Sequence, residues 1–201
     1  MKVGIIGGGR VGSRLAASLR EAGVLAGITA ASEQHSAQLA QQFGVPVTDN
    51  AMLWQEADVL LLTVPDRLIG TVAEKLAQSV TPAAKVVLHV SGSVGLEPLA
   101  PLTQLGAHVG SLHPLQSFAG GNTQLAGVYM ALDGDSEAQD AGKKLVELFG
   151  GKACGLSCGS VHLLELCRSG GGYGGAADGA LDRQQRSCLG GVVAFVQRYG
   201  G

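Results

Sequence analysis

The sequence predicts a doubly wound α/β fold, in which a mostly parallel sheet carries helices on both faces. Short β-branched or leucine-rich runs alternate along the chain with segments whose apolar residues recur at helical spacing. Residues 58–64 (DVLLLTV) form an uninterrupted apolar run, which is typical of a strand buried on both faces of a parallel sheet. A glycine-rich loop also follows the first apolar run and precedes the first helical segment.

The individual elements follow from periodicity and from start and stop residues. Val11, Leu15 and Leu19 share one face of a helix that Gly23 ends, and Ser32 is a good N-cap for the next helix. The expected strands are residues 2–7, 25–31, 45–47, 58–64, 85–90, 107–112 and 128–132. The expected helices are residues 10–22, 33–43, 67–79, 97–105 and 136–149.

Composition excludes several classes of protein. Hydrophobic residues make up 46% of the 201 residues and charged residues 15%, which excludes disorder, coiled coil and collagen. The net charge is −2 with no basic stripe, so neither nucleic acid nor an acidic membrane is an expected partner. The apolar runs are too short to cross a bilayer, and no secretory signal is recognisable. We therefore expect a soluble, cytoplasmic protein that acts on a small molecule.

The glycine-rich loop carries the strongest chemical signal. It matches the G-x-G-x-x-G pattern between a strand and a helix, where backbone N–H groups at the helix start attract phosphate. A merely flexible glycine turn is the alternative. The expected cofactor-binding residues are Gly7, Gly8, Gly9, Arg10, Val11 and Gly12.

The end of the second strand bears on which dinucleotide binds. NAD sites usually place a carboxylate there for the ribose, whereas this chain has Ala30, Ala31 and Ser32, with no acid before Glu33. Ser32 and Arg10 are able to donate to a 2′-phosphate, so we expect NADP rather than NAD, although Ser32 also serves as a helix cap.

Three later segments end strands on the same side of the sheet, where ligands bind in such folds. They are residues 63–66 (TVPD), 89–93 (HVSGS) and 111–118 (SLHPLQSF). His113 is the candidate proton-transfer residue and Ser91 a candidate substrate ligand, while a structural role is the alternative for both. Val64 and Pro65 are expected beside the cofactor, and Asp66 either caps the next helix or takes part in the site.

The remaining histidines and the cysteines show no site pattern. His89 lies within an apolar run and is expected in the core, and His108 has no apparent partner. The spacing of Cys154, Cys158, Cys167 and Cys188 is not that of a zinc site, so we expect no metal.

Taken together, the segments GIIGGGRVGSRLAASLREAG, LLLTVPDRLI, VVLHVSGSVG and GSLHPLQSF resemble a family of bacterial Rossmann-like oxidoreductases whose C-terminal domain has no assigned function. This family is similar to the pyrroline-5-carboxylate reductases and the 6-phosphogluconate dehydrogenase-like group. The resemblance covers residues 1–150. It implies an NADP-binding domain followed by a helical domain that closes the substrate pocket and builds a homodimer.

The last quarter of the chain departs from that family. Residues 150–201 hold 14 of the 32 glycines, all four cysteines and no proline. They lack the Tyr-His-Ala and Ser-Asn stretches with which the family's helical domain opens. We therefore expect an NAD(P)-binding domain over residues 1–152 and an aberrant, partly disordered, Gly-rich tail over residues 153–201, truncated by a frameshift near codon 152; a genuine flexible extension is the alternative.

Two functions remain open at this point. The first is an NADP-dependent oxidoreductase that transfers hydride between the nicotinamide and a small carbonyl or imine compound. The second is a non-catalytic dinucleotide-binding or sensing module.

Overall fold

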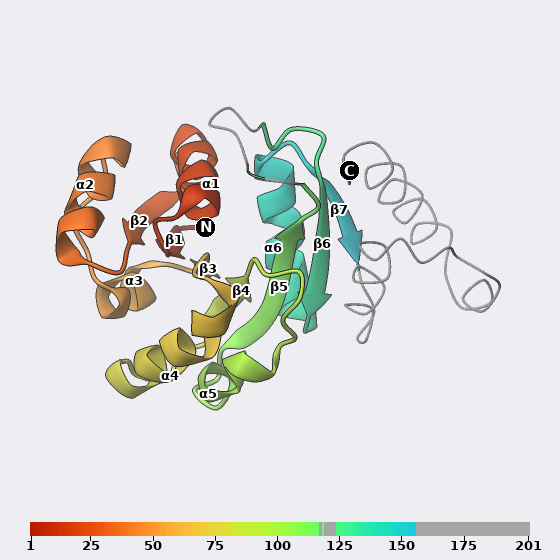
Figure 1. Cartoon of the computed structure of the whole chain (residues 1–201). Helices are drawn as coiled ribbons and strands as arrows, with labels where there is room; N and C mark the ends of the chain where they lie inside the picture. The colour runs from red at the N-terminus through yellow and green to blue at the C-terminus, as the bar shows by residue number, and fades with distance from the viewer. Residues whose placement is uncertain (117, 119–123, 156–201) are drawn as a thin grey trace.

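The computed structural model describes residues 1–116, 118 and 124–155, which form one seven-stranded sheet with helices on both faces (Figure 1). The strand order is β2-β1-β3-β4-β5-β6-β7, and every neighbouring pair is parallel except the antiparallel pair β5–β6. This arrangement confirms the predicted doubly wound, mostly parallel α/β class.

The bounds of the elements are as follows. The strands are β1 (Val3–Ile6), β2 (Leu25–Thr29), β3 (Val59–Leu62), β4 (Val86–His89), β5 (His108–Pro114), β6 (Tyr129–Gly134) and β7 (Lys152–Gly155). The α-helices are α1 (Arg10–Glu21), α2 (Glu33–Phe43), α3 (Asn50–Glu56), α4 (Ile69–Ser79), α5 (Ala100–Thr103) and α6 (Ser136–Leu148). Two 3₁₀ turns, η1 (Asp66–Leu68) and η2 (Glu97–Leu99), precede α4 and α5.

Two hydrophobic cores lie on the two faces of the sheet. Helices α1, α2 and α6 cover one face, and α3, α4 and α5 cover the other (Figure 1). Strand β3 shows why the apolar run is continuous: Leu61 packs into the first core, while Leu60 and Leu62 pack into the second. Because helices cover both faces of the sheet, the side chains that point to either face of this strand are buried.

The segment between α2 and β3 differs from the expectation. Residues 45–47 are not a strand, because the Val45 N–H bonds back to the Ala40 carbonyl at the end of α2, Pro46 has no N–H to give to a sheet, and the Val47 side chain is 63% exposed. Helix α3 was not expected. Its N-cap is Asp49, whose carboxylate accepts from the Met52 N–H at 2.8 Å.

The other expected elements are present, α2 with the expected bounds and the rest with shifted ends. The helices expected over residues 67–79 and 97–105 each begin with a 3₁₀ turn. Strand β7 extends the sheet beyond β6 and begins at Lys152, where we placed the end of the dinucleotide domain. The expectations for Cys158, Cys167, Cys188 and the rest of the tail lie outside the described residues. Within the described part, no helix is long and apolar enough to span a membrane.

Candidate functional site

The glycine loop (residues 7–12) joins β1 to α1 at the carboxyl edge of the sheet. The Gly7 N–H donates to the Thr29 carbonyl at 2.9 Å, and the Thr63 hydroxyl donates to the Gly7 carbonyl at 2.6 Å. The loop is therefore tied to the ends of both neighbouring strands. Thr63 was quoted in the sequence only as part of a strand end, and its contact with the loop was not foreseen.

Gly7 and Gly12 shape this loop for different reasons. Gly7 has φ +123°, a conformation that side chains rarely adopt. A Cβ on Gly12 would collide with the Gly7 carbonyl oxygen and approach the Thr63 hydroxyl to 2.5 Å, so α1 packs against the turn only because residue 12 is glycine.

Gly9 differs from both, because a Cβ built there would meet nothing within 4 Å. Neither packing nor backbone strain in the chain requires glycine at this exposed position, where φ is −74°. Gly9 is the N-cap of α1, and no side chain caps the helix or places an acid in its first turn. The open space and the unshielded helix start fit a phosphate group approaching the backbone.

The other predicted loop residues surround this opening. A Cβ on Gly8 would run into the Leu39 side chain, Arg10 is exposed at the first position of α1, and Val11 packs partly against the core. Val64 and Pro65 follow β3 at the same edge of the sheet, with Val64 half-buried and Pro65 exposed. The structure therefore brings these predicted cofactor-binding residues together.

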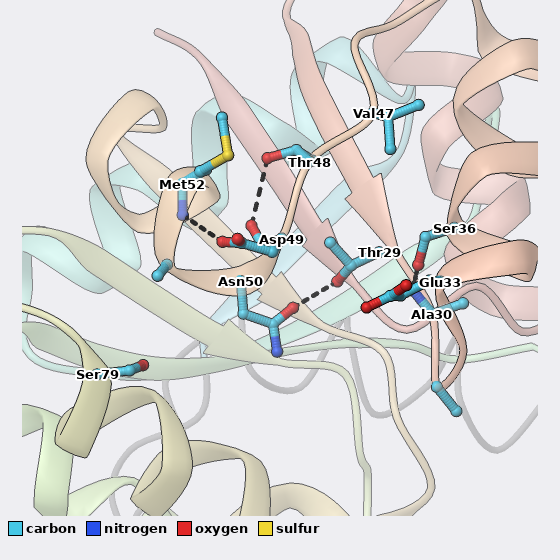
Figure 2. Close-up of a pocket in the computed structure, with 12 residues that line it drawn as sticks. Thr29, Ala30, Glu33, Ser36, Val47, Thr48, Asp49, Asn50, Met52 and Ser79 are labelled. Atoms are coloured by element: carbon cyan, nitrogen blue, oxygen red, sulfur yellow. Dashed lines mark hydrogen bonds between the residues drawn. The ribbon is translucent and has the colours of Figure 1, made fainter.

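A pocket of about 620 Å³ lies beyond the end of β2 (Figure 2). Thr29, Ala30 and Ala31 form one side, and the start of α3 forms another. The Thr29 hydroxyl donates to Asn50 Oδ1 at 2.6 Å, which links the strand to the helix across the pocket. The pocket lies where the second ribose of a dinucleotide is expected. Asn50 was not predicted, because α3 was not.

An acidic residue lines this pocket, although no carboxylate was expected at the end of the second strand before Glu33. Glu33 lines it together with Asp49, whose carboxylate already caps α3. Ser32 is the N-cap of α2, as expected, with its hydroxyl accepting from the His35 N–H at 3.2 Å. Glu33 is therefore the carboxylate that a 2′-phosphate or a ribose hydroxyl would meet here.

The loop after β4 is bonded to the first residue of η1, the turn that follows β3. The Ser93 hydroxyl donates to Asp66 Oδ2 at 2.7 Å, and the Ser91 hydroxyl accepts from the Ser93 and Val94 N–H groups, both at 3.2 Å. The expectation that Asp66 caps a helix is wrong: no side-chain cap bond opens η1 or α4, because the carboxylate is turned toward Ser93. Ser91 is buried, and it stabilises the turn that follows it.

His113 lies against the same loop. Its Nδ1 is 3.0 Å from the Val90 carbonyl oxygen, and a Cβ on Gly92 would overlap the imidazole, with 2.6 Å to Cδ2. A carbonyl oxygen only accepts hydrogen bonds, so Nδ1 of His113 carries a hydrogen. Glycine at position 92 is therefore what allows the half-buried ring to lie against this loop.

His89 is completely buried, as expected of a core residue. Its Nε2 is 3.1 Å from the Gly95 carbonyl oxygen, and its Nδ1 has no hydrogen-bond partner among the described residues. Burial lowers the pKa of the His89 imidazole, so the ring is neutral at pH 7.

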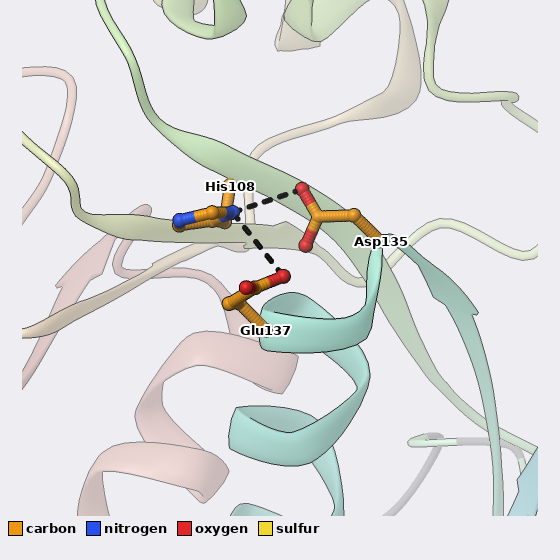
Figure 3. Close-up of side chains that lie close together, drawn as sticks. All are labelled: His108, Asp135 and Glu137. Atoms are coloured by element: carbon orange, nitrogen blue, oxygen red, sulfur yellow. Dashed lines mark hydrogen bonds and ion pairs between the residues drawn. The ribbon is translucent and has the colours of Figure 1, made fainter.

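His108 does have partners, contrary to the expectation. Its Nδ1 lies 3.2 Å from Asp135 Oδ2 and 3.6 Å from Glu137 Oε2 (Figure 3). The Ser136 hydroxyl lowers the pKa of the Glu137 carboxyl by hydrogen bonding, and His108 contributes less. This group joins the first residue of β5 to the start of α6, at the opposite end of β5 from His113.

Comparison with known proteins gives the same fold. A family model described as a Rossmann-like domain matches residues 1–114. A pyrroline-5-carboxylate reductase from Methanosarcina acetivorans is 31% identical over 100 residues, which cover 47% of this chain and 37% of that protein. A D-apionate oxidoisomerase from Cupriavidus necator is 26% identical over 163 residues, covering 73% of this chain and 58% of that protein. This chain therefore spans less than two thirds of the length of either relative.

Among solved structures, an arogenate dehydrogenase from Synechocystis is similar to the whole chain. The TM-score is 0.67 at 22% sequence identity, with 100% of this chain and 84% of that chain covered. At this identity the likeness establishes the fold.

Proposed function

This chain belongs to the Rossmann-like domain family, and from that premise we propose that it binds a nicotinamide dinucleotide, with NADP preferred to NAD. We further propose that it serves an oxidoreductase acting on a small carbonyl or imine compound. The observation that carries the proposal is the open space above Gly9 at an uncapped helix start. A relative named pyrroline-5-carboxylate reductase supports the imine substrate class.

The chain's own residues would hold the cofactor in three places. The glycine loop binds the pyrophosphate through backbone N–H groups, and the pocket beside Asn50 takes the adenosine half. Val64 and Pro65 border the nicotinamide, which supplies the hydride when bound. Arg10, exposed at the start of α1, is the cation we assign to the 2′-phosphate.

Ser91 and His113 would orient the substrate and exchange the proton. Since Nδ1 of His113 donates to the Val90 carbonyl, Nε2 is the atom that gives a proton to, or takes one from, the substrate nitrogen or oxygen. The Ser91 hydroxyl accepts two backbone N–H bonds and lies 3.4 Å from the Ser93 hydroxyl, which itself donates to Asp66. A bound substrate acceptor would therefore compete with Ser93 Oγ for the Ser91 hydrogen.

The test is NADPH oxidation by the full chain with 1-pyrroline-5-carboxylate as the probe substrate. We expect turnover, and we expect His113→Asn to lower kcat by about 100-fold, the usual contribution of a proton-transfer residue. His35→Asn, at an exposed position on α2, is the matched control and keeps wild-type turnover. Equal activity of the His113 and His35 variants contradicts the assignment of His113.

A non-catalytic dinucleotide-binding or sensing module is the second candidate. It is favoured by the structural bonds that both candidate residues already make, since Ser91 accepts from two backbone N–H groups and His113 lies against the Val90 carbonyl. NADPH binding without turnover of any carbonyl or imine probe would select this function over the first.

A further inference from the structure

His89 stands out among the residues of β4, which otherwise carries only apolar side chains. It is 0% exposed, although burial of an imidazole costs free energy unless its nitrogens are bonded. One nitrogen lies beside the Gly95 carbonyl and the other has no partner among the described residues. A leucine would fill this position without a buried polar atom of its own, but it would give no donor to the Gly95 carbonyl. The histidine therefore needs a reason beyond packing.

The Gly95 contact supplies that reason. Residues 91–95 form the loop that carries Ser91 and Ser93 and on which the His113 ring rests. Asp66 holds the loop at Ser93, and His89 holds its far end at Gly95, at 3.1 Å from Nε2 to the carbonyl oxygen. A carbonyl oxygen accepts, so the neutral ring carries its hydrogen on Nε2.

We propose that His89 is a positioning residue, which fixes the loop of residues 91–95 from beneath so that Ser91 and His113 keep their places toward the substrate. The proposal rests on the proposed function for its catalytic consequence. Its structural part is that the Nε2–H group of His89 holds the loop, and this part does not depend on whether the protein turns over a substrate. His89 itself touches neither the cofactor nor the substrate, because it is wholly buried.

Two substitutions separate positioning from packing. His89→Gln keeps a donor within reach of the Gly95 carbonyl, whereas His89→Leu fills the space without a donor. We expect His89→Leu to lower kcat about tenfold, to leave the KM for NADPH unchanged, and to lose exchange protection at the Ser93 and Val94 amides, which donate to Ser91. We expect His89→Gln to restore both readouts.

Leu88→Ala is the control for lost stability. Leu88 is equally buried on the same strand but packs into the opposite core. We expect Leu88→Ala to lower the global stability. The exchange protection of the Ser93 and Val94 amides should then fall only in proportion to that of the other sheet amides. If His89→Leu behaves like wild type and His89→Gln is impaired, then the role of His89 is packing, and the proposal is overturned.

A measurement on the unchanged chain covers the case in which neither variant folds. The ¹⁵N shifts of the His89 ring report which nitrogen carries hydrogen. We expect hydrogen on Nε2 and none on Nδ1, and the opposite tautomer overturns the proposal. Because the ring shifts and the amide exchange need no substrate, they test the proposal even where 1-pyrroline-5-carboxylate is not turned over.

Discussion

At the scale of single residues, three glycines of one loop have three different physical roles. Gly7 adopts a positive φ, Gly12 lets α1 approach the turn, and Gly9 leaves space that the chain itself does not use. The first two serve the fold, and only the third points to a ligand. The G-x-G-x-x-G pattern predicted the loop, whereas the separation of these roles required the surroundings of each Cβ.

Arg10 gives a prediction on cofactor choice. If it pairs with a 2′-phosphate, Arg10→Ala weakens NADPH binding by about tenfold or more and leaves NADH binding nearly unchanged, because a hydrogen bond to a charged group contributes about 1.5–3 kcal/mol. The measurement is a fluorescence titration with both cofactors. Arg20→Ala, at the other end of α1, is the control. Equal losses for NADPH and NADH would reject the assignment.

Glu33 gives the opposite prediction in the pocket that it lines. Removing its negative charge favours a 2′-phosphate, so Glu33→Gln raises the ratio of NADPH to NADH affinity several-fold. Glu21→Gln, an exposed carboxylate at the end of α1, leaves the ratio unchanged. A lower ratio in Glu33→Gln would mean that this position favours NADPH through something other than charge.

His89 gives a prediction on pH. Burial lowers its pKa from the ordinary value of 6.5, so the unfolded chain takes up a proton near that pH while the folded chain does so only at lower pH. Below about pH 6.5 the unfolded state binds more protons than the folded state. The free energy of unfolding therefore decreases as the pH is lowered, until the pKa of His89 in the folded state is reached. Urea unfolding of His89→Gln should therefore depend less on pH in this range. His35→Gln is the control. If it reduces the pH dependence of the unfolding free energy as much as His89→Gln does, the assignment of this dependence to His89 is contradicted.

At the scale of elements, the carboxylate of Asp135 makes two interactions at the start of α6. Asp135 caps the helix through Oδ1, which accepts from the Ala138 N–H at 2.9 Å, while Oδ2 lies beside His108. Asp135→Ala should cost about 1 kcal/mol of unfolding free energy, the usual value for a lost N-cap. Asp140→Ala, whose partner is the exposed Lys143, should cost much less in the same urea titration. Equal costs would show that the cap contributes nothing.

The sequence predicted the long, periodic helices and missed the short helix α3. Helix α2 agrees at both ends because Ser32 and Gly44 are strong start and stop residues. Helix α3 has seven residues, too few for a periodic pattern, and the Val45-Pro46-Val47 run resembled a strand although no neighbouring strand pairs with it. The Asp49 cap was the available signal for α3, and recognising it would also have brought Asn50 into the candidate site.

At the scale of the whole molecule, parallel strands bring distant residues to one edge. Gly9, Asp66, Ser91 and His113 follow or end four different strands, and the sheet order places those ends side by side. The sequence predicted this convergence from strand ends alone. It did not predict the hydrogen bonds from Ser93 to Asp66 and from Thr63 to Gly7, because these depend on side-chain directions that only the packed sheet fixes.

The compositional change near residue 152 gives a prediction about the gene. We propose that reading the DNA across codons 145–201 with a one-base correction restores Tyr-His-Ala and Ser-Asn, followed by a long helical reading frame. Independent clones sequenced through this region provide the measurement. An intact frame in all of them, identical to the present sequence, would contradict the proposed frameshift.

Whether the glycine loop binds a nicotinamide dinucleotide is measured by calorimetric titration of NADPH into wild type, Gly9→Ala and Gly70→Ala. A Cβ on Gly9 meets nothing in the chain, and a Cβ on Gly70 makes an ordinary 3.6 Å contact with Pro98, so both variants should fold. We expect saturable binding to wild type and Gly70→Ala, and binding weaker by about tenfold or more to Gly9→Ala, where the methyl group occupies the space for phosphate. Absence of binding to wild type, or equal binding to all three proteins, would contradict it.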